Sequence, residues 1–522
     1  MDVLAAGHPA RGELAGSPQR LAVIDLGSNS FRLVVFTASP EGWWKRTDEI
    51  YEPVRIGEGL GESDVLAKGP MQRAFAMIDV FAHFCRANGL YGNMVDAVAT
   101  SAIREARNGE DFLVRAREMS GLSIRVLSRE EEARYGYMAA VNSTTLGDGC
   151  MVDLGGGSMQ LVRVEGRLAR ESGSWPLGAV RMTERYLRGR GPAKRRQLDE
   201  LRAHVAQELA PATWLRRSGT RLVGIGGTVR TLAVAAQRME GLPSIGVQGQ
   251  IVKVQTLDTL IARLSELPPA ERAEVPGVKP ARADLILAGA VVLREVIELG
   301  GFNGIEATEA GMREGVFFER LLVAEDPPLF GDVRRASVLN LAAQYHVDEA
   351  HTAHVAVLAL GLFDDLAAAG LHPGDSVERE LLWAACMLHD IGMSVDYDDH
   401  HKHTRYLILN AGLPGFSPRE VALIAQAARF HRKGMPAAGE LAPLLSEEGD
   451  AGRLDRMAVL LRLAEGLERS RDQLVRGVGV DVDDARVRLR LVTDESATVP
   501  RWAARREAEL FARAFGTTLE VD

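Results

Sequence analysis

Two stretches of the chain share one pattern of apolar and polar positions. In each, an apolar, β-branched run leads to Asp-Leu-Gly, a short polar turn and a second apolar run; the stretches are residues 21–36 and residues 150–164. Apolar runs that flank a Gly-rich turn are typical of two strands joined as a hairpin. Because the pattern recurs at long spacing, it predicts two related half-domains that face one cleft.

A third Gly-rich turn follows the apolar run near Val223 and precedes a stretch with helical spacing. Backbone N–H groups that converge in such turns, with hydroxyls beside them, suit phosphate oxygens. A single turn of this kind is a weak motif and can be an ordinary loop, but three favour a phosphate site. The predicted phosphate-binding residues are Gly27, Ser28, Asn29 and Ser30 in the first turn, Gly155, Gly156, Gly157 and Ser158 in the second, and Gly226, Gly227 and Thr228 in the third.

Each hairpin also carries an aspartate at the end of its first strand, Asp25 in one and Asp153 in the other. A carboxylate repels phosphate unless a divalent cation or a water molecule lies between them. Carboxylate oxygens are ligands that Mg²⁺ accepts. We therefore predict that Asp25 and Asp153 hold Mg²⁺ or another divalent cation.

With the segments Thr100–Ala106, Ser128–Arg134 and Arg313–Gly315, these turns make the sequence similar to the exopolyphosphatase / guanosine pentaphosphate phosphohydrolase (Ppx/GppA) family, in its long form. That family belongs to the actin, sugar-kinase and Hsp70 superfamily. The resemblance implies an α/β fold of duplicated actin-like (ribonuclease H-like) lobes of the ATPase type. It also implies hydrolysis of a terminal phosphoanhydride, and it suggests a homodimer.

The resemblance places the family's general base at Glu132 and a phosphate-contacting arginine at Arg104. Phosphoanhydride hydrolysis needs a water molecule held in line and relieved of its proton, which one carboxylate can do. Acidic residues in a first helical turn can instead complement the helix dipole, so Glu131 is the natural control. The planar guanidinium of Arg104 suits bidentate contact with phosphate, although an exposed helical arginine is the alternative.

The helical region after Pro327-Pro328 resembles an HD-type metal phosphohydrolase domain, as longer family members carry. The resemblance implies a possible second metal site formed by His354, His389, Asp390 and Glu465. Glu465 stands where the family pattern has Asp, so the alternative is a set of vestigial ligands packed in a helical core. The His-rich run 399–403 could equally contact a polyanion.

At 522 residues the chain is too long for one core. From about residue 475 the pattern changes to short strands and then a helix from Arg501 to Phe515. The predicted organisation is a mobile leader at 1–20, actin-like lobe I at 21–140, actin-like lobe II at 141–325, an all-α HD-like domain at 326–474, and a small α+β domain at 475–522.

Composition limits the partners. The net charge of −9 argues against a nucleic-acid or anionic-membrane binder, because such proteins usually show a basic field. The three cysteines, Cys85, Cys150 and Cys386, lie far apart in apolar surroundings and read as reduced thiols of a cytoplasmic protein. The first twenty residues lack the apolar core of a signal peptide.

Three functions remain open. The first is exopolyphosphatase activity on inorganic polyphosphate, which the long helical domain favours because it suits a polymer channel. The second, guanosine pentaphosphate 5′-phosphohydrolase activity, uses the same chemistry. The third is an actin-like, nucleotide-dependent sensor or binding module. A sugar kinase is disfavoured because the sequence shows no readable sugar pocket.

Overall fold

The computed structural model describes residues 18–483, 486–494 and 496–522. They divide into two compact units, one ending at Val333 and one running from Arg334 to Asp522. The predicted leader lies outside the described residues up to position 17, and strand β1 already begins at Gln19. In the part of the chain that the structure describes, no helix combines the length and apolarity needed to span a bilayer.

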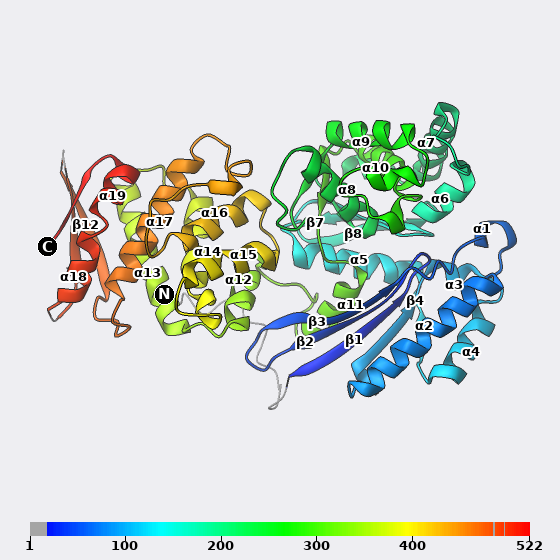
Figure 1. Cartoon of the computed structure of the whole chain (residues 1–522), viewed down its shortest axis with the longest axis horizontal. Helices are drawn as coiled ribbons and strands as arrows, with labels where there is room; N and C mark the ends of the chain where they lie inside the picture. Colours follow the sequence, from blue (N-terminus) through cyan, green and yellow to red (C-terminus); the bar gives the residue numbers. More distant parts are fainter. Residues whose placement is uncertain (1–17, 484–485, 495) are drawn as a thin grey trace. The chain divides into compact units, whose positions relative to one another are not determined.

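The first unit contains two mixed sheets (Figure 1). The first sheet has the order β3-β2-β1-β4-β5, in which β1 pairs antiparallel with β2 and parallel with β4. Its strands are β1 (Gln19–Leu26), β2 (Phe31–Ala38), β3 (Trp44–Glu52), β4 (Val95–Ala99) and β5 (Ile124–Val126). The helices of this half are α1 (Leu60–Ser63), α2 (Lys68–Ala87), α3 (Ser101–Glu105), α4 (Gly109–Ser120) and α5 (Arg129–Ser143).

The second sheet repeats this arrangement. Its order is β10-β11-β9-β6-β7-β8, and β6 pairs antiparallel with β7 and parallel with β9. Its strands are β6 (Gly149–Leu154), β7 (Met159–Glu165), β8 (Leu168–Trp175), β9 (Leu222–Ile225), β10 (Ile251–Lys253) and β11 (Gly304–Ala307). The helices are α6 (Ala179–Tyr186), α7 (Arg195–Leu209), α8 (Gly227–Met239), α9 (Val254–Glu266), α10 (Ile286–Gly300) and α11 (Met312–Leu321).

The duplicated pattern in the sequence therefore corresponds to a duplicated sheet. In both halves, the predicted hairpin joins the central strand to its antiparallel neighbour, so the two hairpin predictions are confirmed. Helices α5 and α11 pack against each other; α5 also contacts the second sheet and α11 the first (Figure 1). Each half has its own apolar core, in which strand residues pack against a larger number of apolar residues from the covering helices and loops.

The second unit is mainly helical and ends in a small sheet. Strands β12 and β13 are antiparallel, and β14 pairs parallel with β13. The helices are α12 (Val333–Gln344), α13 (Glu349–Ala368), α14 (Ser376–Leu388), α15 (His400–Ala411), α16 (Pro418–Arg429), α17 (Asp450–Leu467), α18 (Thr498–Arg505) and α19 (Ala508–Phe515), and the strands are β12 (Gly477–Asp483), β13 (Arg486–Val492) and β14 (Thr518–Val521).

One helix prediction in this unit was wrong. The helix expected from Arg501 to Phe515 is two helices, α18 and α19. At the junction, the N–H groups of Arg506 and Glu507 donate to carbonyls three residues earlier rather than four, which tightens the turn and ends α18. The apolar spacing on either side of this break is nevertheless helical, which explains why the sequence pattern reads as one helix.

Candidate functional site

The floor of the candidate site is formed by the turns of the two hairpins. Each turn is closed by the same backbone hydrogen bond: Gly27 N–H donates to Ser30 O at 3.2 Å, and Gly155 N–H donates to Ser158 O at 3.0 Å. The two turns also touch. A Cβ atom on Gly157 of the second turn would lie 2.9 Å from Ser28 Oγ of the first turn, so only glycine permits this approach.

The third Gly-rich turn brings the start of α8 to the same place. Gly226 adopts a φ of 96°, a left-handed conformation that favours glycine. Gly227 begins α8, and the guanidinium of Arg282 occupies the position where a Cβ on Gly227 would lie. The three turns thus open onto one cavity of about 140 Å³. The sequence-predicted residues that line it are Asp25, Gly27, Ser28, Asn29, Ser30, Glu132, Asp153, Gly155, Gly156, Ser158, Gly226, Gly227 and Thr228.

Two predicted residues stand apart from the cavity wall. Gly157 lies behind it, against Ser28 and Ser101. Arg104 is not among the lining residues either; its Nη1 donates to Leu127 O at 2.7 Å and to Glu132 Oε2 at 2.8 Å. In this structure Arg104 therefore contacts the predicted general base rather than the space where phosphate would lie.

The two adjacent glutamates at the start of α5 have different environments. Glu131 forms a capping box: its Oε2 accepts from Ser128 N–H at 2.8 Å, and its own N–H donates to Ser128 Oγ at 3.1 Å. Its Oε1 lies 3.2 Å from Arg125 Nη1. Glu132, one residue later, is buried and faces the cavity. The structural role of a first-turn acid thus belongs to Glu131.

Burial changes the acidity of Glu132. Desolvation raises its pKa to about 7; Arg104 opposes this shift, and the charges of Asp153 and Asp25 add to it. The side chain is also oriented by Gln160, whose Nε2 lies 3.5 Å from Glu132 Oε2 and donates to Ser158 Oγ at 3.0 Å. A carboxylate with a pKa near neutrality is suited to accept a proton at physiological pH.

Asp25 and Asp153 occupy equivalent positions at the ends of β1 and β6. Burial raises the pKa of Asp25, although Arg313 lies 2.7 Å away and opposes the shift. Burial and the nearby charge of Asp25 raise the pKa of Asp153 to about 6. A divalent cation between the two carboxylates would relieve this repulsion, so the donor set fits Mg²⁺.

The cavity is also lined by four arginines to which the sequence analysis assigned no role: Arg32, Arg230, Arg282 and Arg313. Burial, together with the charges of Arg313 and Arg32, lowers the pKa of Arg230 to about 10. Burial and mutual repulsion make a cluster of guanidinium groups unfavourable unless an anion binds among them. Arg32 and Arg313 do lie within or beside the predicted motifs, whereas Arg230 and Arg282 carry no sequence signal of their own.

Unpartnered polar atoms mark where such an anion would bind. Both polar atoms of the Asn29 side chain are buried without a hydrogen-bond partner among the described residues, and so is Arg313 Nε. Buried polar groups in folded proteins are nearly always paired. The cavity therefore combines unused donors, cations and one carboxylate that can take a proton, which suits hydrolysis at a phosphate group.

The sequence model of the Ppx/GppA phosphatase family matches residues 46–324. The chain belongs to this family. The model of domain III of the Ppx/GppA phosphatases matches residues 333–496.

Solved structures agree with this assignment. The crystal structure of the Aquifex aeolicus Ppx/GppA family member is 28% identical over 59% of this chain and 99% of that chain, with a TM-score of 0.51. An exopolyphosphatase from Cytophaga hutchinsonii has the same fold at 21% identity, covering 58% of this chain and 98% of that one, with a TM-score of 0.54. The first unit is thus the actin-like body of a Ppx/GppA phosphatase, followed by a helical C-terminal region.

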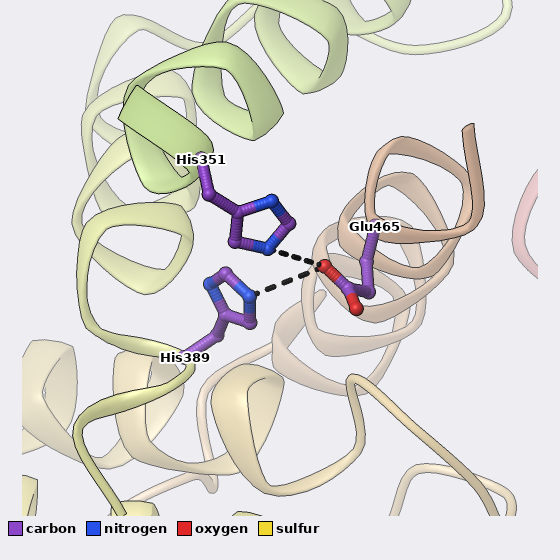
Figure 2. Close-up of side chains that lie close together, drawn as sticks. All are labelled: His351, His389 and Glu465. Atoms are coloured by element: carbon purple, nitrogen blue, oxygen red, sulfur yellow. Dashed lines mark ion pairs between the residues drawn. The ribbon is translucent and has the colours of Figure 1, made fainter. Parts of the chain in front are cut away.

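The helical region matched by domain III contains the residues of the predicted second metal site. His389, Asp390 and Glu465 lie close together there, with His389 Nε2 3.6 Å from Asp390 Oδ1 and 3.4 Å from Glu465 Oε2. His354 does not join them: its Nε2 lies 2.8 Å from Val475 O and 3.6 Å from Glu468 Oε2. His351, one helical turn earlier on α13, takes its place and lies 2.9 Å from Glu465 Oε2 (Figure 2).

Proposed function

We propose that this Ppx/GppA phosphatase is an exopolyphosphatase that releases orthophosphate from the end of inorganic polyphosphate. The observation that carries the proposal is a second cavity of about 610 Å³ beside the first. The two cavities share lining residues, among them Arg32, Arg230, Arg282 and Arg313. Arg46 and Lys279 add positive charge to the second cavity, so its cations outnumber the carboxylates that also line it, Glu49, Glu309 and Glu314. A linear polyanion longer than its terminal phosphate would find counter-charges along this path.

The reaction requires one proton acceptor and a fixed phosphate. The oxygen of a water molecule forms a bond to the terminal phosphorus while the bond from that phosphorus to the bridging oxygen breaks. Glu132 takes a proton from the water, and the shortened chain leaves with the bridging oxygen. Because the transition state of phosphoryl transfer is loose, most of the acceleration comes from positioning and charge neutralisation.

The chain's own residues divide these tasks. The N–H groups of the turns and the Asn29 amide bind the terminal phosphate, and Arg230 and Arg313 neutralise its oxygens. Arg104 and Gln160 hold the Glu132 carboxylate in place. Asp25 and Asp153 would hold Mg²⁺, which supplies charge neutralisation at the phosphate oxygens when bound.

Guanosine pentaphosphate is the second candidate substrate. Tyr51 lines the larger cavity, and its ring could accept a nucleobase face, although Arg32 already lies 4.7 Å from the ring centre. A nucleotide would place its 5′-phosphates in the same cleft. Because the chemistry is identical, only comparison of the two substrates separates these functions.

The test is Mg²⁺-dependent phosphate release from long-chain polyphosphate and, separately, from guanosine pentaphosphate, by the intact chain and its Glu132→Ala variant. We expect release from polyphosphate that the substitution removes. Preference for the nucleotide would make the protein a guanosine pentaphosphate phosphohydrolase. Release from neither substrate would overturn both and favour a nucleotide-dependent sensor.

A further inference from the structure

Two sets of metal-type side chains lie together in the unit that runs from Arg334 to Asp522. The first set is His351, His389 and Glu465, and the second is Asp390, His400 and His431. Within each set, one ligand atom per residue lies within 4.8 Å of the others. Figure 2 shows the first set, in which the two imidazole rings point at the same carboxylate oxygen of Glu465.

The atoms that face each other in the first set are buried. His351 Nε2 and His389 Nε2 form ion pairs with the same oxygen, Glu465 Oε2, at 2.9 Å and 3.4 Å, but none of the three atoms has a hydrogen-bond partner among the described residues. The His351 and His389 side chains are almost fully buried. Buried polar atoms without a hydrogen bond are rare in folded proteins. A cation bound between them would satisfy all three at once.

Three of the histidines are oriented by the backbone in the same way. The Nδ1 atom of each lies close to the carbonyl oxygen of the residue three positions earlier: His389 to Cys386 at 2.7 Å, His400 to Tyr397 at 2.8 Å, and His431 to Ala428 at 2.7 Å. A carbonyl can only accept, so Nδ1 carries the proton in each ring. The Nε2 atom then presents a lone pair, as in metal-binding histidines.

This arrangement sets two lone pairs against each other. His400 Nε2 and His431 Nε2 are 3.0 Å apart. When each ring carries its single proton on Nδ1, the two Nε2 lone pairs face each other and repel at this contact. A metal ion that binds both nitrogens removes the repulsion.

Asp390 links the two sets. Its Oδ1 atom lies 3.6 Å from His389 Nε2, 3.7 Å from His400 Nε2 and 3.9 Å from His431 Nε2. Its other oxygen accepts from Arg471 Nη2 at 2.8 Å, which fixes the carboxylate plane. One carboxylate oxygen thus lies within reach of ions held by either set.

We propose that His351, His389, Asp390, His400, His431 and Glu465 form a centre for two divalent transition-metal ions that binds the phosphate group of a phosphate ester. Mixed imidazole and carboxylate ligands suit Mn²⁺, Fe²⁺ or Zn²⁺ better than Mg²⁺. The centre is separate from the catalytic cleft in residues and in ligand type.

The ligand class follows from the cavity beside the centre. Asp390, His400, His431 and Glu465 line a cavity of about 540 Å³. Its other charged lining residues are mostly cations, namely Arg432, Lys433, Arg462, Arg469, Arg471 and Arg506, with Glu507 opposing them. So many cations around a metal centre favour a doubly charged anion such as phosphate.

Two aromatic rings at this cavity indicate an organic group on the phosphate. Tyr397 is 52% exposed and Trp502 is 55% exposed, and both line the cavity. Each carries an arginine over its ring, Arg432 and Arg506 respectively, both at 5.0 Å from the ring centre. The planar group of a phosphate ester could replace the arginine on either ring and stack there, which free phosphate cannot do.

The alternative is a cluster of ion pairs without metal. Burial opposes a positive charge on His389, but Asp390 and Glu465 outweigh it and raise the His389 pKa to about 9. A protonated His389 would then pair with both carboxylates. That cluster accounts for His389 and for the ion pair of His351 with Glu465, but it gives no reason for His400 Nε2 and His431 Nε2 to face each other at 3.0 Å.

The test loads the full-length protein with Mn²⁺, removes free metal by gel filtration, and measures manganese per chain. The comparison variants are His351→Ala, His400→Ala and the double variant, with His354→Ala as the control. His354 lies on the same helix as His351 but outside both sets. We expect the wild type and His354→Ala to hold two more Mn²⁺ ions per chain than the double variant.

Electron paramagnetic resonance of the loaded wild type tests the centre without any substitution. Two Mn²⁺ ions that share Asp390 should give an exchange-coupled signal, and each single variant should lose it. Equal manganese content in wild type and double variant, or a wild type with uncoupled Mn²⁺ only, would overturn the proposal.

Ligand binding is tested with adenosine 5′-monophosphate as the probe, by the broadening of its ³¹P resonance by loaded protein. We expect broadening in the wild type and His354→Ala that falls by at least half in the double variant. Equal broadening in all three would assign the phosphate to the cleft and overturn the ligand class. Broadening of inorganic phosphate but not of the nucleotide would contradict the role of Tyr397 and Trp502.

Discussion

The catalytic cleft and the histidine cluster both bury carboxylates, but they balance the charge differently. In the cleft, arginines contact the acids: Arg313 pairs with Asp25 at 2.7 Å and Arg104 with Glu132 at 2.8 Å. In the cluster, imidazole nitrogens take that place, with His351 2.9 Å from Glu465. Guanidinium groups stay protonated and cannot bind a metal, whereas a neutral imidazole can.

This difference separates two kinds of site. The cleft offers carboxylate oxygens and permanent cations. The cluster offers imidazole nitrogens whose rings are oriented by backbone carbonyls. Four predictions test the cleft side of this comparison.

The largest effect is expected at the proton acceptor. Glu132→Gln keeps the shape of the side chain but removes its ability to accept a proton, so turnover of polyphosphate should fall by about 10²–10⁴-fold. Steady-state phosphate release measures this loss. The matched control is Glu131→Gln, which touches the helix cap and should leave turnover within about threefold of wild type while lowering stability by about 1 kcal/mol. A reversed ranking would show that the base is Glu131.

The second prediction concerns the pairing of acid with arginine. Arg313→Met leaves Asp25 buried without its cation, so the free energy of unfolding of the first unit should fall by about 3–5 kcal/mol. Urea denaturation measures the change. Arg320→Met is the control on the same helix: Arg320 pairs with Asp96 at 3.2 Å near the surface and should cost less than about 1 kcal/mol. Equal losses would mean that Asp25 does not depend on Arg313.

The third prediction tests the path for the polyanion. Arg230→Met removes a buried cation shared by both cavities, so the KM for long-chain polyphosphate should rise by about 10–100-fold, the equivalent of one charged hydrogen bond. Arg238→Met, on the exposed part of the same helix, should leave KM unchanged. An unchanged KM in Arg230→Met would remove the second cavity from the substrate path.

The smallest effect is a shift in pH dependence. Glu132 acts as a base only when it has lost its proton, so kcat/KM should rise with pH through about 7, where burial places its pKa. Arg104 lowers that pKa, so Arg104→Met should move the acidic limb of the profile to higher pH. A change in KM with an unmoved limb would instead support phosphate contact by Arg104.

The sequence predicted most of the cleft because its parts lie in contiguous motifs. The two hairpins, the third turn and Glu132 each sit in a short segment whose turn residues and apolar flanks carry a local signal. Arg230 and Arg282 carry no such signal, because their role depends on how α8 and the segment before α10 approach the hairpins. Arg104 shows the same limit, since its position in the sequence did not indicate that it contacts Glu132.

The histidine cluster shows that spacing along a helix does not decide which of two nearby histidines faces a given carboxylate. Helices α13 and α17 present two His–Glu pairs, His351 with Glu465 at 2.9 Å and His354 with Glu468 at 3.6 Å. The members of each helix are three residues apart, so both pairs lie on nearly the same face. The sequence pattern places His354 and Glu465 in one site. In the structure these two residues belong to different His–Glu pairs. Only the packing register of the two helices resolves the choice.

The position of α11 also bears on how the protein is made. Although α11 ends the first unit, Arg313 at its start reaches Asp25 on β1, 288 residues earlier, and Phe317 stacks on Phe36 of β2 at 4.5 Å between ring centres. Gly315 lies directly against the backbone of Tyr135 on α5. A nascent chain therefore cannot complete the cleft until α11 has left the ribosome, and a fragment truncated before Met312 would expose the apolar surface that α11 covers. Synthesis of nearly the whole first unit must precede the first hydrolytic event.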